Sequence, residues 1–151
     1  MKRAAALCAR SEQAPGDIRS KLIDWGINAT DASRIVKSLI EQGFLDESRF
    51  AKAFVKDKFT FNGWGKTKLA YQLRLKGIPA EVIDEAMNVI ADEQYRDRLV
   101  GLLRAKWQSV REREPRAARA AMMRFASSRG FETGIAAECV KQVTKTDVQE
   151  D

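Results

Sequence analysis

Basic residues between positions 49 and 76 have the types and spacing needed to bind an acidic partner. These eight residues are Arg49, Lys52, Lys56, Lys58, Lys66, Lys68, Arg74 and Lys76. With one aspartate in the same stretch, the net charge is 8 − 1 = +7, which exceeds the +6 of the whole chain. A block of this kind favours a surface for a nucleic acid or an acidic protein groove. The competing interpretation is an ordinary solvated helix face.

Aromatic residues interrupt this basic block and are the other candidates for binding. Trp64 lies in the turn Gly63-Trp64-Gly65, directly after Phe59 and Phe61. Trp64 is interpreted either as a turn aromatic packed on the core or as an exposed anchor, since Trp and Arg dominate interface hot spots. Phe59 and Phe61 carry the same two interpretations.

Residue types that support catalysis or metal binding are scarce in this chain. It contains no histidine, which removes the usual general base and most zinc and iron sites. Cys8 and Cys139 are far apart and form no Cys-x-x-Cys pair, so they predict buried thiols rather than a metal site. We expect no metal and no cofactor.

Two further patterns imitate catalytic motifs but are incomplete. Gly65-Lys66-Thr67 matches the end of a phosphate-binding loop, which requires a glycine where Thr60 stands and a preceding strand. The acidic residues at positions 81, 84, 85, 92 and 93 have helical spacing, which favours a solvated face over a carboxylate site. We therefore expect a protein that is not an enzyme and that does not hydrolyse ATP.

Helices must position the basic block, because apolar residues recur at helical spacing along the chain. In the first of these helices Phe50, Ala51, Phe54 and Val55 form an apolar stripe, with the basic residues at 49, 52 and 56 on another face. The pattern predicts no strand. Predicted helices cover residues 3–10, 17–25, 46–59, 65–76, 93–113 and 116–129. Three more contain the apolar stripes at 32–40, 82–90 and 135–143; Asn28 or Thr30 caps the first of these three, and Pro79 opens the second.

A repeat near 50 residues organises these helices. Gly26, Gly77 and Gly130 each end one helix and precede another, at intervals of 51 and 53 residues. Apolar residues recur nine and thirteen positions after each glycine, which indicates tandem units that each contact mainly their neighbours. The predicted fold is all-α, with three tandem three-helix repeats in an elongated, curved array. The predicted boundaries are 1–44, 45–91 and 92–145, followed by a polar tail at 146–151.

The central stretch resembles the RecX family of bacterial regulators of the RecA recombinase. The resemblance rests on the block from Gly43 to Val55, the Gly63-Trp64-Gly65 turn and the Lys76-Gly77-Ile78 end, with weaker matches near residues 18–22 and 125–131. It covers nearly the whole chain. Three features depart from the family pattern: residues 59–62 lack a basic residue that the family usually has there, this linker is one residue longer, and Ala14 stands where a serine usually caps the second helix.

The resemblance implies a non-enzymatic regulator that binds the RecA–DNA filament. It also implies inhibition of filament growth, strand exchange, ATPase and coprotease activities, in DNA repair, recombination and the SOS response. The alternative is a direct nucleic-acid-binding helical module, since helix pairs joined by a glycine turn are typical of helix-turn-helix units. Single- or double-stranded DNA therefore remains open as a second partner.

Composition limits the cellular setting. No stretch approaches the ~20 apolar residues of a membrane span, and the apolar run that begins the chain ends at Arg10, too early for a signal peptide. We expect a cytoplasmic monomer that has no contact with a membrane. The partner-binding residues expected from the resemblance and the charge pattern are Arg49, Lys52, Lys56, Lys58, Trp64, Lys66, Lys68, Arg74 and Lys76.

Overall fold

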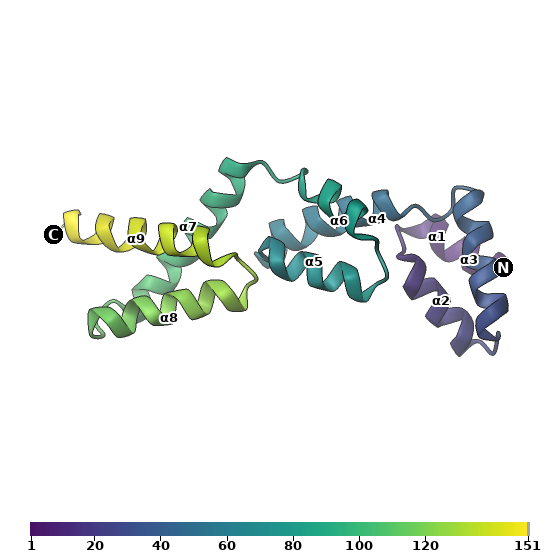
Figure 1. Cartoon of the computed structure of the whole chain (residues 1–151), viewed down its shortest axis with the longest axis horizontal. Coiled ribbons are helices and arrows are strands. Elements are labelled where there is room, and N and C mark those ends of the chain that lie inside the picture. The colour runs from purple at the N-terminus through teal and green to yellow at the C-terminus, as the bar shows by residue number, and fades with distance from the viewer. Residues whose placement is uncertain (151) are drawn as a thin grey trace. The chain divides into compact units, whose positions relative to one another are not determined.

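The computed structural model describes residues 1–150, with side chains through residue 145 (Figure 1). Throughout this part of the chain the regular secondary structure is helical, and no strand occurs in it. The first helices are α1 (Lys2–Arg10), α2 (Pro15–Asp24), α3 (Ala29–Glu41), α4 (Glu47–Asp57) and the π-helical turn η1 (Lys58–Asn62). The others are α5 (Lys66–Leu75), α6 (Ala80–Met87), α7 (Asp92–Val110), α8 (Pro115–Ser128) and α9 (Thr133–Glu150). The all-α prediction, with three tandem three-helix repeats, is confirmed.

Side-chain caps explain where several of these helices begin. The side chain of Asn28 accepts a hydrogen bond from the Asp31 amide at 2.9 Å, and Asp46 Oδ1 accepts one from the Arg49 amide at 3.0 Å. Both satisfy backbone donors that the first helical turn leaves unpaired. Glu114 caps α8 in the same way, a role that the sequence analysis did not assign.

The repeated glycines occupy equivalent places, as the spacing predicted. Gly26, Gly77 and Gly130 have φ angles of 94°, 81° and 91°, a left-handed conformation that favours glycine. At each, the glycine amide donates to the carbonyl three residues back, and the next amide donates to the carbonyl five residues before itself. This pair of bonds is the Schellman arrangement, which closes a helix and turns the chain into the next one.

The contacts divide the chain into two compact units. Unit one contains Met1–Lys56 and Ala70–Val89, and unit two contains Asp57–Leu69 and the chain from Ile90 onward. The division passes through α5, the middle helix of the predicted central repeat. The predicted repeat boundaries stay a prediction. Of the predicted polar tail, the backbone of α9 continues to Glu150, and its side chains and residue 151 lie outside the described residues.

Unit one has an apolar cluster built from its first three helices. Its buried members are Ala4, Ile18, Leu22, Ala32, Leu39 and Leu45, surrounded by partly buried residues such as Trp25 and Ile35. Helices α2 and α3 pack against each other, as the amphipathic pattern of α3 requires. Farther along unit one, Ala51 and Val55 of α4 are fully buried, which confirms the inward face of that helix.

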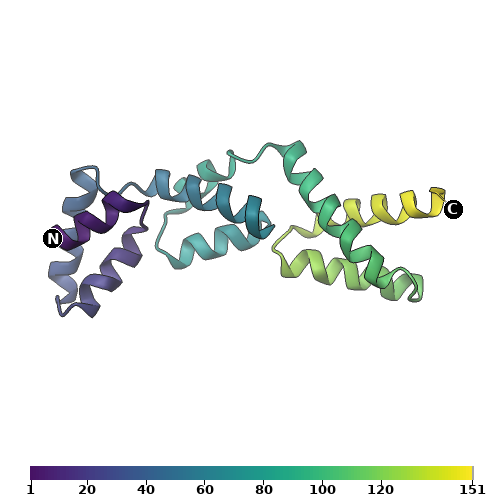
Figure 2. The same cartoon turned by 180° about the vertical axis from the view of Figure 1, so that it is seen from behind.

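Unit two is built around three long helices, α7, α8 and α9, which pack pairwise (Figures 1 and 2). In both views α8 and α9 run beside each other from the turn that joins them. Leu99, Leu103, Met122 and Cys139 are fully buried. Cys139 is thus a core thiol, in agreement with the sequence analysis, and burial raises its pKa.

The π-helical turn η1 was not predicted. The sequence analysis described residues 59–62 as an aromatic linker, whereas the chain continues from α4 through one wider turn to Gly63, whose φ is 66°. A π-turn accommodates one extra residue in a helix without ending it.

Candidate partner-binding surface

The structure divides the nine candidate residues between the two units. Unit one contains the α4 and α5 cations Arg49, Lys52, Lys56, Arg74 and Lys76, whereas unit two contains Lys58, Trp64, Lys66 and Lys68. The two groups differ in the side chains that surround their cations.

Carboxylates partly neutralise the group in unit one. Arg49 Nε lies 2.9 Å from Glu12 Oε1, and Lys52 Nζ lies 3.7 Å from Glu85 Oε1. Lys76 Nζ lies 2.8 Å from Asp17 Oδ2 and also 5.9 Å from the centre of the Phe50 ring. Half-buried Lys76 is thus a connection between α2 and the end of α5. Its role as a partner-binding residue has the weakest support of the five.

The remaining cations of unit one are more accessible. Lys56 and Arg74 are exposed, and among the described residues neither makes an ion pair. Arg74 lies between Tyr71 and Leu75, which are 52% and 65% exposed. Residues at i, i+3 and i+4 share one helix face. The end of α5 therefore presents an aromatic, a cationic and an aliphatic side chain together.

The group in unit two surrounds Trp64. Lys68 Nζ lies 4.6 Å from the centre of the Trp64 ring and Lys58 Nζ lies 5.2 Å from it, both within the range of cation–π attraction. Trp64 itself is half-buried. It is neither a core aromatic nor a fully exposed anchor, and it holds two ammonium groups at the surface of the turn.

Lys66 has a structural partner in Tyr95 of α7. Its backbone amide donates to Tyr95 Oη at 2.9 Å, and its ammonium group lies 4.8 Å from the Tyr95 ring centre. Tyr95 Oη donates in turn to Glu132 Oε1. Burial and the hydrogen bond to Glu132 raise the pKa of Tyr95 well above its usual range. The buried phenol thus joins the start of α5 to the start of α9.

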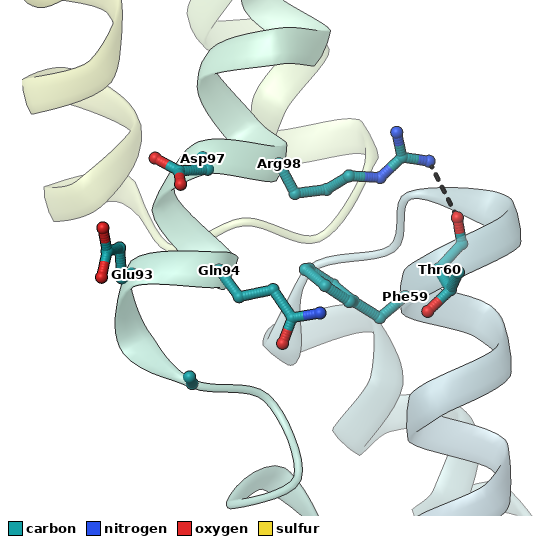
Figure 3. A pocket seen from close by; sticks show the side chains of 7 residues that line it. Phe59, Thr60, Glu93, Gln94, Asp97 and Arg98 are labelled. Atoms are coloured by element: carbon teal, nitrogen blue, oxygen red, sulfur yellow. Dashed lines mark hydrogen bonds between the residues drawn. The ribbon is translucent and has the colours of Figure 1, made fainter.

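Two arginines that the sequence analysis did not single out hold the π-turn. Arg98 Nη2 donates to the Thr60 carbonyl at 3.2 Å, and Arg129 Nη1 donates to the Asn62 carbonyl at 3.0 Å. They lie 38 and 67 residues away along the chain, so no local pattern could indicate either contact. Figure 3 shows Arg98 reaching from α7 across to the carbonyl of Thr60.

A pocket of about 600 Å³ lies beside this contact (Figure 3). The residues that line it are Phe59, Thr60, Ala91, Glu93, Gln94, Asp97 and Arg98. Its two carboxylates, Glu93 and Asp97, come from α7 and project from the opposite side of that helix to Arg98 (Figure 3), and the lining holds no nucleophile paired to a base. The pocket thus has no arrangement that we can connect to a reaction.

Within the described residues, no group of three His, Cys, Asp or Glu side chains could hold a metal ion. No helix there is both long enough and apolar enough to cross a bilayer.

The chain is similar to known proteins in both sequence and fold. The model of the second three-helix domain of RecX matches residues 46–87, which are α4 to α6 with the π-turn. The regulatory protein RecX of Clostridium botulinum (strain Eklund 17B / Type B) is 30% identical over 127 residues. The chain thus resembles RecX proteins. That alignment covers 83% of this chain and 59% of the relative.

Two more RecX proteins are similar to this chain over most of its length. The regulatory protein RecX of Clostridium beijerinckii is 24% identical over 136 residues, which are 89% of this chain and 63% of that protein. The chain thus spans about three fifths of the length of these curated relatives. The crystal structure of RecX from Lactobacillus salivarius matches with a TM-score of 0.83 at 16% identity, covering 95% of this chain and 93% of that one. This match shows that the fold is shared.

Proposed function

We propose that this RecX-like chain regulates RecA by binding the RecA–DNA filament through its central repeat, residues 45–91. The main support for the proposal is that two features overlap in the sequence. The family domain matches residues 46–87, and the basic block occupies residues 49–76. The DNA of such a filament contributes phosphate groups, and the cations of the central repeat have the charge to attract them.

The end of α5 supports a protein partner in particular. Exposed Tyr71 and Leu75 flank Arg74, and protein interfaces are enriched in aromatic residues and arginine at their centres. The proposed contact residues are the nine candidates, in one group per unit: Arg49, Lys52, Lys56, Arg74 and Lys76 in unit one, and Lys58, Trp64, Lys66 and Lys68 in unit two. Lys56 and Arg74 are the main free cations of the group in unit one, because Arg49, Lys52 and Lys76 already have carboxylate partners.

Tandem repeats suit a filament of repeated subunits. Each three-helix repeat can meet a successive subunit, and several weak contacts then sum through effective concentration. A bound chain occupies surface that a filament needs for growth and for strand exchange. We therefore expect inhibition of both, together with lower ATP turnover and less cleavage of repressor substrates. The protein itself acts without a catalytic residue, metal or cofactor, and as a monomer in the cytoplasm.

Co-sedimentation tests this proposal. RecA filaments assembled on single-stranded DNA, and the same DNA without RecA, are centrifuged with increasing amounts of the purified chain. We expect binding to the filaments at concentrations where the DNA alone carries little of the chain down. Equal recovery with both would contradict a RecA-directed function and favour the nucleic-acid-binding module instead.

A further inference from the structure

Helix α8 has an outer face of uniform positive charge. Its fourteen residues, Pro115–Ser128, include Arg116, Arg119 and Arg124 but no aspartate or glutamate. All three arginines are exposed, whereas Ala118, Ala121, Met122 and Ala126 are buried. The arginines therefore lie on the half of the helix that faces solvent. An ordinary solvated helix face carries charges of both signs, which this one does not.

No described side chain neutralises this face. Among side chains of residues 1–145, none makes an ion pair with Arg116, Arg119 or Arg124. The nearest acid in sequence, Glu114, directs its carboxylate to the backbone amides of Arg116 and Ala117 at 3.1 Å, where it caps the helix. The cations of unit one differ, because three of its five candidate residues have carboxylate partners.

The α8 face also lacks the side chains that anchor protein interfaces. Apart from the arginines, the exposed residues of α8 are Pro115, Ala117, Ala120, Ser127 and Ser128. No large apolar residue of α8 is exposed, in contrast to Tyr71 and Leu75 on α5. Interface centres are rich in aromatic side chains and poor in isolated charges. Phosphate contacts require no apolar anchor, since charge and hydrogen bonding supply the attraction.

The predominance of arginine over lysine also favours a phosphate ligand. Of the eight basic residues between positions 99 and 130, seven are arginine and one is lysine. With two glutamates, that stretch carries 8 − 2 = +6. The planar guanidinium donates two parallel hydrogen bonds to a phosphate, which an ammonium group cannot do. A regular row of phosphates thus matches a face with several arginines and no carboxylates.

We propose that the outer face of α8, formed by Arg116, Arg119 and Arg124, binds the phosphodiester backbone of a nucleic acid. The helix contains no asparagine or glutamine and exposes no large apolar side chain, so this contact positions the chain without reading a base sequence. The inference goes beyond the proposed function and does not rest on it, since the surface is in a different repeat and its ligand is tested without RecA.

The test uses the full chain and a fluorescein-labelled single-stranded 30-mer of mixed sequence. The variant R116Q/R119Q/R124Q removes three charges from α8, and glutamine keeps a helix propensity similar to that of arginine. The matched control K52Q/K56Q/R74Q removes three charges from unit one, so both variants have a net charge of +6 − 3 = +3. Binding is titrated at several salt concentrations, and thermal unfolding is followed for each protein.

We expect the α8 variant to bind the oligonucleotide at least ~10-fold more weakly at low salt. Its plot of log K against log[salt] should lose about 2 from its slope, since each phosphate contact with a single strand accounts for about 0.7. The control variant should keep most of the wild-type affinity and most of the wild-type slope. Equal weakening of the two variants would show that net charge alone governs binding, and unchanged binding by the α8 variant would contradict the proposal directly.

Two additions keep the result decisive. Polyglutamate at matched charge concentration is used as a competitor, and displacement equal to that by unlabelled oligonucleotide would assign the surface to acidic proteins instead. Should the triple variant unfold early, R116Q, R119Q and R124Q are measured singly. Each is then expected to lower the slope by about 0.7, and no change in any of them would overturn the proposal.

Discussion

Gly65 and Gly130 meet backbone to backbone, although 65 residues separate them. The Gly65 amide donates to the Arg129 carbonyl at 2.7 Å, and the Thr67 amide donates to the Gly130 carbonyl at 2.9 Å. A Cβ atom on Gly65 would lie 2.4 Å from the Gly130 carbonyl carbon, and one on Gly130 would lie 2.2 Å from Lys68 Cβ. Both distances are shorter than real Cβ contacts, so neither position has room for a side chain.

The same relationship occurs once more within unit one. A Cβ atom on Gly16 would lie 2.6 Å from the carbonyl oxygen of Lys76, the residue that precedes Gly77. The start of the second helix of a repeat thus meets the glycine turn of the next repeat in both places. The glycines therefore serve two purposes, since they close helices and allow successive repeats to approach.

Substitution of Gly130 by alanine should be strongly destabilising. The new methyl group would clash with Lys68, and the φ of 91° disfavours any residue with a Cβ atom. We expect a loss of about 3 kcal/mol or more in the free energy of unfolding, because strain and steric overlap act together. Urea unfolding monitored by circular dichroism measures the change.

Two control variants separate these causes. Gly26 has a φ of 94° but open space around its Cβ position, so Gly26→Ala should cost only the strain of about 1–2 kcal/mol. Gly101 lies within α7 with nothing within 4 Å, so Gly101→Ala should be neutral or stabilise by up to about 1 kcal/mol. Equal losses at positions 26 and 130 would show that the close approach contributes nothing.

Much of the fold was predictable because it is encoded locally. Helical periodicity located each helix within a few residues, and the interval between Gly26, Gly77 and Gly130 revealed the repeat. The caps at Asn28 and Asp46 are local in the same sense, since each joins residues three positions apart. The π-turn was missed because an extra residue within a helix leaves its flanking pattern of apolar residues intact.

The candidate surface was less predictable because ion pairs form between distant residues. Lys76 pairs with Asp17, 59 positions away, and Arg129 reaches the carbonyl of Asn62. Local spacing shows that a cation is on the outside of a helix. It does not show whether another helix places a carboxylate beside it. For that reason the charge of the central block overstates how many of its cations are free for a partner.

Tyr95 makes the stability of the protein sensitive to alkaline pH. Its folded-state pKa is raised by burial and by the hydrogen bond to Glu132, so the folded protein resists losing the phenolic proton. The stabilisation is fully present below pH ~10, the pKa of an unfolded tyrosine. As pH rises above 10, the unfolded state ionises first, and the free energy of unfolding should fall steadily.

The variant Y95F isolates this contribution. It should unfold more easily at pH 7 by about 1–3 kcal/mol, because the amide of Lys66 loses its acceptor, and its stability should depend less on pH above 10. Absorbance of phenolate near 295 nm provides a second measure, as the chain has two tyrosines. The phenolate absorbance of folded wild type and of folded Y95F should be the same at pH 10–11. Additional phenolate absorbance in wild type at that pH would contradict a buried, protonated Tyr95.

Charge reversal on α4 tests the central repeat. We expect K52E/K56E to leave the fold intact but to abolish inhibition of strand exchange. Both lysines are exposed, and the pair that Lys52 makes with Glu85 at 3.7 Å is of a kind that contributes at most about 1 kcal/mol. Attraction to an acidic groove would become repulsion at two positions. Thermal unfolding and RecA-dependent strand exchange are measured together.

The variant R34E/K37E is the matched control for this experiment. It places the same change of charge on exposed positions of α3 in the same unit. It should inhibit strand exchange nearly as well as wild type. A well-folded K52E/K56E that still inhibits at wild-type concentrations would show that this side of α4 is only a solvated face.

The apolar residues of α5 should distinguish filament binding from DNA binding. In Y71A/L75A the truncated side chains are 52% and 65% exposed, so the fold should be little affected. If they are interface anchors, the loss of binding should reach about 2 kcal/mol, or roughly 30-fold in affinity for RecA filaments. Binding to the single-stranded oligonucleotide should not change, since no charge is removed. Phe61→Ala, at a position that is 79% exposed in unit two, is the control for removing a surface aromatic. If Y71A/L75A lowers oligonucleotide binding as much as filament binding, the end of α5 contacts nucleic acid instead of RecA.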